Sequence, residues 1–191
     1  MEKTWNEEIR KACEVMQKGG VIIYPTDTIW GIGCDATNAE AVRRVYEIKH
    51  REDSKSMLVL VDSEAKVDYY VEEVPAVAWD LIELADKPLT IIYDGARNLA
   101  SNLIAADGSV GIRVTREEFS RALCARFRKA IVSTSANISG EPAAATFADI
   151  NPELLEAVDY VVGCCREETG AAKPSSIVKL GAHGEIKVIR Q

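Results

Sequence analysis

Few residues of this sequence are typical ligands of transition metals. Only two of the 191 residues are histidines, which argues against a His-rich metal site. The five cysteines are odd in number, none belongs to a Cys-x-x-Cys pair, and the adjacent Cys164 and Cys165 lack the spacing of zinc ligands. We therefore expect no metal site in the protein itself and predict reduced, mostly buried thiols, as is usual in the cytosol.

Long hydrophobic runs are also absent. No apolar stretch approaches the roughly 18 residues that a membrane-spanning helix needs, and no signal peptide precedes the first expected helix. We expect no membrane contact and a cytoplasmic location.

Positive charge is scarcer than negative charge. The chain has 23 Lys and Arg against 30 Asp and Glu, a net charge of −7, and its pI is near 5.0. This balance argues against a protein that coats nucleic acid, which normally needs a basic surface. A local basic cleft stays compatible with it, because net charge does not say how charge is distributed.

Repeats, low-complexity tracts and linkers are missing as well, and the 47% hydrophobic content supports a substantial core. Helices and strands are expected to alternate early in the chain, while strands cluster late. This order favours a single α/β domain over 5–191 with a twisted, open mixed sheet.

Hydrophobic periodicity and capping patterns place the expected elements. Thr4, Thr37 and Thr115 each precede a Glu by three residues, as in a capping box, and Asn151 before Pro152 is typical of a helix start. The helices are expected at 7–17, 38–48, 75–85, 116–129 and 152–158. The strands are expected at 21–24, 57–61, 89–93, 110–114, 131–132, 160–162, 176–180 and 186–189.

Polar residues stand where several of these strands end. The stretch "GGVIIYPTDTIWGIG" (19–33) passes from a buried strand into a loop tightened by proline and glycine. "STSANISG" follows Val132, and "KPSS" precedes Ile177. Such residues either form ordinary turns or line a binding site at the edge of a sheet.

The segment "KHREDSK" (49–55) adds Lys49, Arg51 and Lys55 at a helix end. Cations with hydroxyls and loop N–H groups suit a polyanion such as a nucleotide phosphate. The alternative is a solvated surface whose cations complement the helix dipole. Neither G-x-x-x-x-G-K-[ST] nor G-x-G-x-x-G occurs, so neither standard nucleotide loop is present.

"YPTDTIWGIG", "KHR", "SVGIRV" and "STSANISG", in this order and spacing, resemble the YrdC/TsaC family, the threonylcarbamoyl-AMP synthases of tRNA modification. The resemblance runs from about Gly19 to Arg190. It implies a YrdC-like domain with a concave, locally positive cleft. It also implies a nucleotidyltransferase that makes threonylcarbamoyl-AMP and pyrophosphate from L-threonine, bicarbonate and ATP. A partner transferase complex would then modify a tRNA adenosine, and tRNA or double-stranded RNA would be a further contact.

The resemblance also implies roles for single residues. For L-threonine, the matching positions are Thr28, Arg113, Ser133 and Ser175. For ATP, they are Arg51, Lys55, Ser109, Ser135, Asn137, Ala143 and Arg190. Lys49 and Arg51 are the expected catalytic cations, with Mg²⁺ entering together with ATP.

In the expected mechanism, threonine and bicarbonate form a carbamate whose oxygen attacks the α-phosphorus of ATP. Lys49, Arg51, Lys55 and Mg²⁺ would neutralise charge, and the segment 49–57 could close over the labile carbamate. Trp30 is expected to wall the cleft. Asp27 is expected to cap its own loop.

Three departures from the family pattern leave alternatives open. The run "REDSKSML" lacks the two prolines usual in the family, Leu60 stands where some relatives have a histidine, and Trp30 replaces the commoner tyrosine. One alternative is a YciO-like paralogue without this activity. Another is a double-stranded RNA or tRNA-binding protein, and a third is a carbamoyl-adenylate domain as in hydrogenase maturation.

Overall fold

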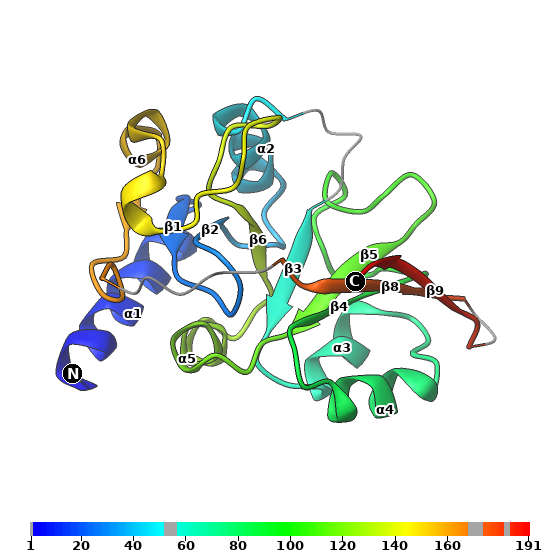
Figure 1. Cartoon of the computed structure of the whole chain (residues 1–191). Helices are drawn as coiled ribbons and strands as arrows, with labels where there is room; N and C mark the ends of the chain where they lie inside the picture. Colours follow the sequence, from blue (N-terminus) through cyan, green and yellow to red (C-terminus); the bar gives the residue numbers. More distant parts are fainter. Residues whose placement is uncertain (1, 52–56, 168–173, 182–183) are drawn as a thin grey trace.

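The computed structural model describes residues 2–51, 57–167, 174–181 and 184–191. Nine strands within these residues form one sheet in the order β7-β1-β2-β6-β3-β5-β4-β8-β9 (Figure 1). The pairs β1–β7, β3–β5 and β4–β8 are parallel and the other five are antiparallel. The predicted α/β fold with a mixed sheet is confirmed.

The strands are β1 (Ile22–Tyr24), β2 (Gly31–Gly33), β3 (Leu58–Val61), β4 (Leu89–Tyr93), β5 (Val110–Val114), β6 (Ile131–Ser135), β7 (Tyr160–Val161), β8 (Ser176–Leu180) and β9 (Ile186–Arg190). The helices are α1 (Glu2–Gln17), α2 (Ala39–Ile48), α3 (Ala65–Tyr70), α4 (Val77–Leu84), α5 (Glu118–Phe127) and α6 (Pro152–Ala157), with a 3₁₀ turn at Phe147–Asp149. Figure 1 shows α3, α4 and α5 on one side of the sheet and α2 and α6 on the other. Within the described residues, no helix has the length and apolar character needed to cross a membrane.

Two helices begin later than the capping boxes predicted. Helix α2 is capped by Asn38, whose side chain accepts from the N–H groups of Glu40 and Ala41, and α5 is capped by Glu117. The two expected caps are engaged elsewhere. Thr37 donates to the carboxylate of Asp35, and Thr115 pairs with the hydroxyl of Ser120. The sequence pattern was therefore wrong about the capping residue, while the helices themselves are confirmed. The Asn151 cap of α6 is also confirmed.

Two segments that were expected to be loops belong to the sheet. Gly31–Gly33 forms β2, between β1 and β6, and β6 continues to Ser135. The short helix α3 was not predicted. Glycine is rare in strands, so a Gly-Ile-Gly sequence gave no strand signal. Here a Cβ on Gly33 would lie 2.5 Å from the carbonyl oxygen of Val132, so the close strand contact itself requires glycine.

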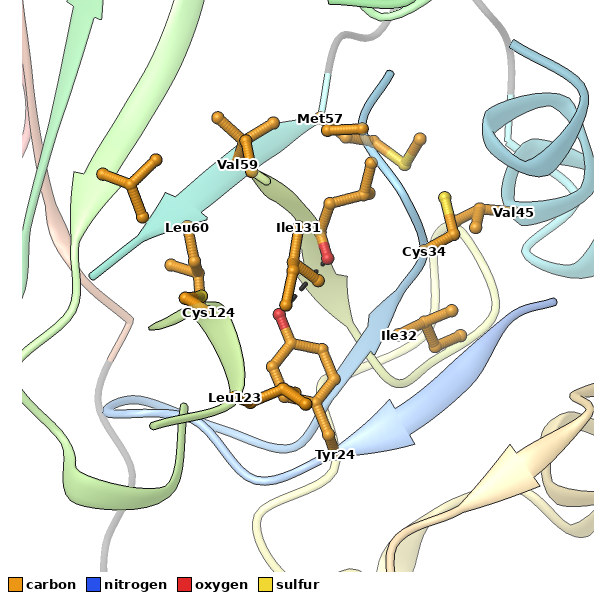
Figure 2. Packing of buried hydrophobic residues seen from close by; sticks show 14 of the residues in the cluster. Tyr24, Ile32, Cys34, Val45, Met57, Val59, Leu60, Leu123, Cys124 and Ile131 are labelled. Atoms are coloured by element: carbon orange, nitrogen blue, oxygen red, sulfur yellow. Dashed lines mark hydrogen bonds between the residues drawn. The ribbon is translucent and has the colours of Figure 1, made fainter. Parts of the chain in front are cut away.

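The core lies along the sheet and includes the predicted Phe119, Leu123 and Phe127 of α5. Figure 2 shows Tyr24 of β1 reaching under β6, where its hydroxyl donates to the carbonyl of Val132 at 3.2 Å. Cys13, Cys34 and Cys124 are free and buried, while Cys164 and Cys165 are half-buried. The prediction of reduced, mostly buried thiols agrees with this arrangement.

Candidate functional site

An open cleft with a volume of about 380 Å³ lies over the middle of the sheet. Its size is within the usual range for small-ligand sites. The polar or charged residues that line it are Thr26, Thr28, Arg51, Thr90, Arg113, Ser133, Thr134, Ser135, Ser175 and Arg190. None of the lining residues in the described part of the chain is Asp or Glu. The cleft is therefore suited to an anionic ligand.

The loop after β1 is closed by Thr26. Its hydroxyl donates to the carbonyl of Ile29 at 2.6 Å and accepts from the N–H of Thr28 at 3.2 Å. A threonine that bonds to nearby backbone groups forms a tight turn of this kind. The turn presents the Thr28 hydroxyl to the cleft, 3.4 Å from Nη2 of Arg113.

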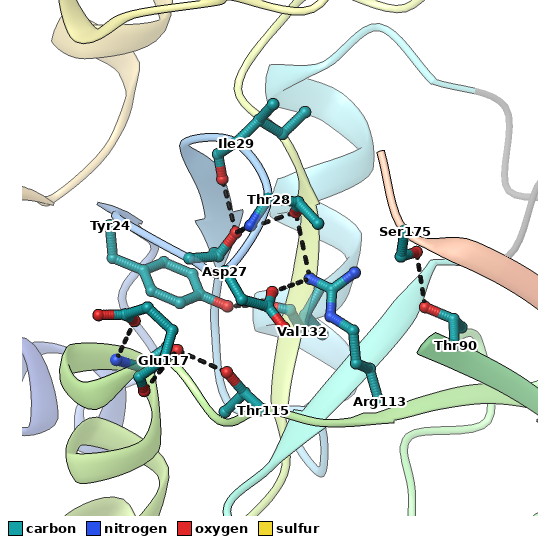
Figure 3. A network of polar contacts seen from close by, with 12 residues as sticks. Tyr24, Asp27, Thr28, Ile29, Thr90, Arg113, Thr115, Glu117, Val132 and Ser175 are labelled. Atoms are coloured by element: carbon teal, nitrogen blue, oxygen red, sulfur yellow. Dashed lines mark hydrogen bonds and ion pairs between the residues drawn. The ribbon is translucent and has the colours of Figure 1, made fainter. Parts of the chain in front are cut away.

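Asp27, which was expected to cap its own loop, forms an ion pair with Arg113. Its Oδ1 lies 3.0 Å from Nη2 of Arg113, and the two side chains are 11% and 4% exposed (Figure 3). The Asp27 Oδ1 and the Arg113 Nε are both buried without a hydrogen bond of normal geometry. A buried guanidinium with an unused N–H has the capacity to bind a carboxylate from the cleft.

Burial dominates the electrostatics of this pair. It raises the pKa of the Asp27 carboxyl, an effect that the positive charge of Arg113 opposes. Burial also shifts the pKa of Arg113, in the opposite direction, by lowering it. Both shifts have the sign expected when charges leave water, so a further anion beside Arg113 would compensate a charge that is costly to bury.

The cleft floor contains a row of cross-strand neighbours. Ile91 pairs with Ile112, so continuing the antiparallel register by one step places Thr90 opposite Arg113. Thr90 pairs with Ile177 of β8, which pairs with Arg190 of β9. The two arginines thus stand three strand spacings apart, about 14 Å.

A β-bulge directs Arg190 toward the cleft. Ile177 pairs with Arg190 but Val178 pairs with Val188, so Ile189 is an extra residue on β9. Inserting one residue reverses which face the following side chain occupies. The Arg190 guanidinium then donates from Nε to the carbonyl of Ser175 at 2.9 Å.

Lys49 and Asn137, two of the expected site residues, do not line the cleft. Lys49 is 1% exposed, and its ammonium donates to the carbonyls of Ser135 and Asn137. Burial and the charge of Arg51 lower the pKa of Lys49 to about 8. The amide of Asn137 donates to the carbonyls of Ile138 and Glu141. Both residues therefore shape the loop after β6.

The remaining expected residues divide between the cleft and its surroundings. Arg51 and Ala143 line the cleft together with Thr28, Arg113, Ser133, Ser135, Ser175 and Arg190. Ser109 does not line it, and its hydroxyl donates to Asp107 at 2.6 Å. Lys55 lies outside the described residues, as does most of the segment expected to close over the carbamate. Trp30 is buried against Phe147, 4.9 Å between ring centroids, and is not a cleft wall.

Sequence reasoning missed Thr26 and Thr90 as cleft residues. Thr26 stands in the quoted "YPTDT", so its hydroxyl was a visible candidate. Thr90 gave no such signal, because it lies in an apolar strand, Leu89–Tyr93, whose register with β5 and β8 is a tertiary property.

A second cavity of about 120 Å³ lies beside Asp27, lined mostly by apolar residues of α4, β4, β5 and the segment between α4 and β4. The two cavities lie on opposite faces of β4 and β5, because Ile91 and Ile112 line the smaller space while Thr90 and Arg113 line the larger. We place the functional site in the larger cleft because the three arginines and the hydroxyls meet there.

Comparisons with known proteins agree with this architecture. A family model named Sua5_yciO_yrdC, described as telomere recombination, matches residues 14–191. The threonylcarbamoyl-AMP synthase of Idiomarina loihiensis is 32% identical over 183 residues, covering 93% of this chain and 94% of that protein.

Two solved structures share the fold. E. coli YciO has a TM-score of 0.83 at 24% identity, covering 96% of this chain and 88% of its own. P. abyssi Sua5 complexed with L-threonine has a TM-score of 0.80 at 22% identity over 90% of this chain, which spans 50% of that longer protein. The resemblance noted in the sequence is confirmed by a match over nearly the whole chain, and the protein belongs to the Sua5/YciO/YrdC family.

Proposed function

We propose that this protein is a threonylcarbamoyl-AMP synthase, which converts L-threonine, bicarbonate and ATP into threonylcarbamoyl-AMP and pyrophosphate. The name of the Idiomarina relative supports this assignment. The observation that carries it is the buried Arg113, which lines a cleft without acidic residues among its described lining and has an Nε with no hydrogen-bond partner. This combination fits the carboxylate of an amino acid.

The amino-acid end of the cleft would be formed by hydroxyls around Arg113. Thr28 lies beside its guanidinium, and Ser133 and Ser175 line the same cavity. The guanidinium would hold the carboxylate of threonine, and the hydroxyls would bind its amine and side-chain oxygen. P. abyssi Sua5, which has the same fold, is described in complex with L-threonine.

The nucleotide end would be formed by Arg51 and Arg190 with Ser135 and Ala143. The two guanidinium groups suit the phosphates of ATP.

No group of three His, Cys, Asp or Glu side chains able to hold a metal occurs in the described residues. Mg²⁺ would therefore arrive bound to the ATP phosphates, as is common for this ion.

The reaction requires no covalent enzyme nucleophile. The amine of threonine attacks bicarbonate, and water leaves to give a carbamate. A carbamate oxygen then forms a bond to the α-phosphorus while the bond to the leaving pyrophosphate breaks. The arginines would hold the reactants in line and neutralise the phosphate charge, so catalysis would rest on positioning and electrostatics.

The product is a mixed anhydride and needs an acceptor. We propose that a tRNA threonylcarbamoyl transferase complex uses it to modify adenosine in the cytoplasm, with tRNA as a further contact.

The assignment is tested by pyrophosphate release with ATP, threonine and bicarbonate, each omitted in turn. We expect release that requires all three, and Arg113→Lys should raise the KM for threonine about 10- to 100-fold because a lysine cannot bind a carboxylate bidentately. The affinity for ATP should change less than about threefold. Folded wild-type protein that releases no threonine-dependent pyrophosphate would instead support the YciO-like alternative.

A further inference from the structure

We propose that Thr90 is an additional substrate-binding residue, whose hydroxyl donates a hydrogen bond to a carbamate oxygen of the N-carboxylated threonine. This inference rests on the proposed function. No pattern in the sequence had marked Thr90 as a site residue. Thr90 lies on β4 in the floor of the cleft, and it is 2% exposed.

The position of Thr90 follows from the strand register. It stands between the two arginines of the cross-strand row, next to Arg113 and two strands from Arg190. If Arg113 holds the carboxylate and Arg190 the phosphate end, the reacting carbamate lies between them. Opposed side chains on neighbouring strands have Cβ atoms about 5 Å apart, so Arg113 and Thr90 can reach one small ligand.

A count of the hydrogens leaves one donor of the Thr90–Ser175 pair unused. Its Oγ1 lies 2.9 Å from Oγ of Ser175 (Figure 3), and within the described residues this is its hydrogen-bond partner. Two hydroxyl groups carry two hydrogens, but a single hydrogen bond between them uses one. One O–H in this buried pair therefore has no acceptor among the described residues.

Arg190 occupies one of the two lone pairs of the Ser175 hydroxyl. Its Nη2 lies 3.4 Å from Oγ of Ser175, and a guanidinium can only donate. In the arrangement that the proposal adopts, Ser175 accepts from Arg190 and donates its own hydrogen to Thr90. The hydrogen of Thr90 points onward into the cleft, where an anionic oxygen would satisfy it.

Gly111, a glycine next to Thr90, leaves space for a ligand at the depth of the Thr90 side chain. A Cβ on Gly111, another cleft residue, would meet Cγ2 of Thr90 at 3.3 Å and Cβ of Leu58 at 3.4 Å. Gly111 has no positive φ that would demand glycine. Its missing side chain leaves the floor open next to the methyl group of Thr90.

The test compares Thr90→Val, which keeps the shape and removes the hydroxyl, with Thr90→Ser, which keeps the hydroxyl. Thr90→Val should reduce kcat/KM for pyrophosphate release about 10- to 100-fold, the usual effect of losing one hydrogen bond to a charged group. The Kd values for ATP and threonine alone should change less than about threefold. Thr90→Ser should recover most of the lost rate.

Thr115→Val is the matched control. Thr115 also pairs with a serine hydroxyl, Ser120, at 2.8 Å, and it is buried away from the cleft. Any loss that comes from breaking a buried Thr–Ser pair should appear there too. Equal losses of rate in Thr90→Val and Thr115→Val would overturn the proposal, as would wild-type turnover by Thr90→Val.

A binding measurement separates this inference from the proposed function. N-carbamoyl-L-threonine carries a stable, planar carbonyl in the place of the carbamate, and its affinity can be measured by calorimetry without turnover. Thr90→Val should weaken its binding about 10-fold while leaving threonine binding unchanged. If the wild type releases no pyrophosphate but Thr90→Val still weakens this binding, the synthase assignment is refuted and the Thr90 contact is retained. Equal affinities of the wild type and the variant would refute the contact.

Discussion

Asp27 places a carboxylate behind Arg113, on the side away from the cleft, where it lines the smaller cavity. The guanidinium is thus already paired before a substrate carboxylate arrives. The two anions would share one cation and repel each other across it. Asp27 is a positioning residue in this geometry, because it fixes the guanidinium without lining the cleft.

Replacing Asp27 by Asn should therefore have two opposite effects. It leaves the Arg113 charge buried without its carboxylate, which should reduce the free energy of unfolding by about 3 kcal/mol. It also removes the repulsion, so the affinity for threonine should rise severalfold. Urea unfolding and a threonine titration followed by calorimetry measure the two effects. A large loss of threonine affinity would show instead that Asp27 binds the substrate amine.

At the scale of elements, β2 packs so closely against β6 and Tyr24 that no side chain fits at Gly33. A Cβ at Gly33 would lie 2.5 Å from the carbonyl oxygen of Val132 and 2.6 Å from Tyr24. At Gly31, in the same strand, the nearest atoms would be at 3.2 Å or more, and that residue lines the cleft.

Gly33→Ala should consequently reduce the free energy of unfolding by about 2–3 kcal/mol, because the overlap involves backbone that cannot move aside. Gly31→Ala, the matched substitution, should cost less stability and weaken ligand binding more. Denaturant unfolding of both variants checks the order. A reversed order of stability would contradict the register of β2 and β6.

Lys49 connects two other elements, the end of α2 and the loop after β6. Its carbonyl accepts from the N–H of Ser139 at 2.8 Å, while its ammonium donates to the carbonyls of Ser135 and Asn137. These contacts explain why a lysine expected to be a catalytic cation does not line the cleft. It acts on the site by holding the segment that carries Ser135.

The buried ammonium predicts a pH dependence of stability. The pKa of Lys49 is lowered from 10.5 to about 8, so between these values the unfolded chain binds more protons than the folded protein. The free energy of unfolding then rises with pH in this window. Relative to Lys49→Met, the wild type should gain on the order of 2–3 kcal/mol from pH 7 to pH 10. A constant difference in urea unfolding between the two proteins across this range would contradict the lowered pKa.

At the scale of the whole molecule, the cleft collects residues from distant parts of the chain. Thr28 follows β1 and Arg51 follows α2, while Arg113, Ser135 and Arg190 belong to β5, β6 and the last strand, β9. A ligand in the cleft therefore contacts strands across most of the sheet. Its binding free energy should stabilise the whole sheet at once.

MgATP at about 100 times its Kd should add about 2.7 kcal/mol to the free energy of unfolding. For a chain of this size, that corresponds to an increase in Tm of roughly 5–10 °C. Scanning calorimetry should show one transition that moves as a unit. Two transitions of which ATP shifts only one would mean that the sheet unfolds in separate parts. Arg190→Ala should reduce the shift if that residue contacts the phosphates.

Much of the fold was predictable because local patterns reported it. Leu89–Tyr93, Val110–Val114 and Ser176–Leu180 were predicted with the bounds that the structure has. Their apolar, β-branched composition indicates strands whatever their neighbours are. Gly31–Gly33 was missed because its strand conformation depends on pairing with β1 and β6.

The sequence by itself determined the α/β class, the main strands, and the clustering of hydroxyls and cations at strand ends, since these depend on residues close together in the chain. "YPTDT" also marked the loop that presents Thr28. Only the tertiary structure decided that Asp27 pairs with Arg113, that Lys49 turns away from the cleft, and that Thr90 stands between two arginines. These facts depend on strand register, on a bulge and on loop contacts, which join residues up to 88 positions apart. No local sequence pattern contains that information.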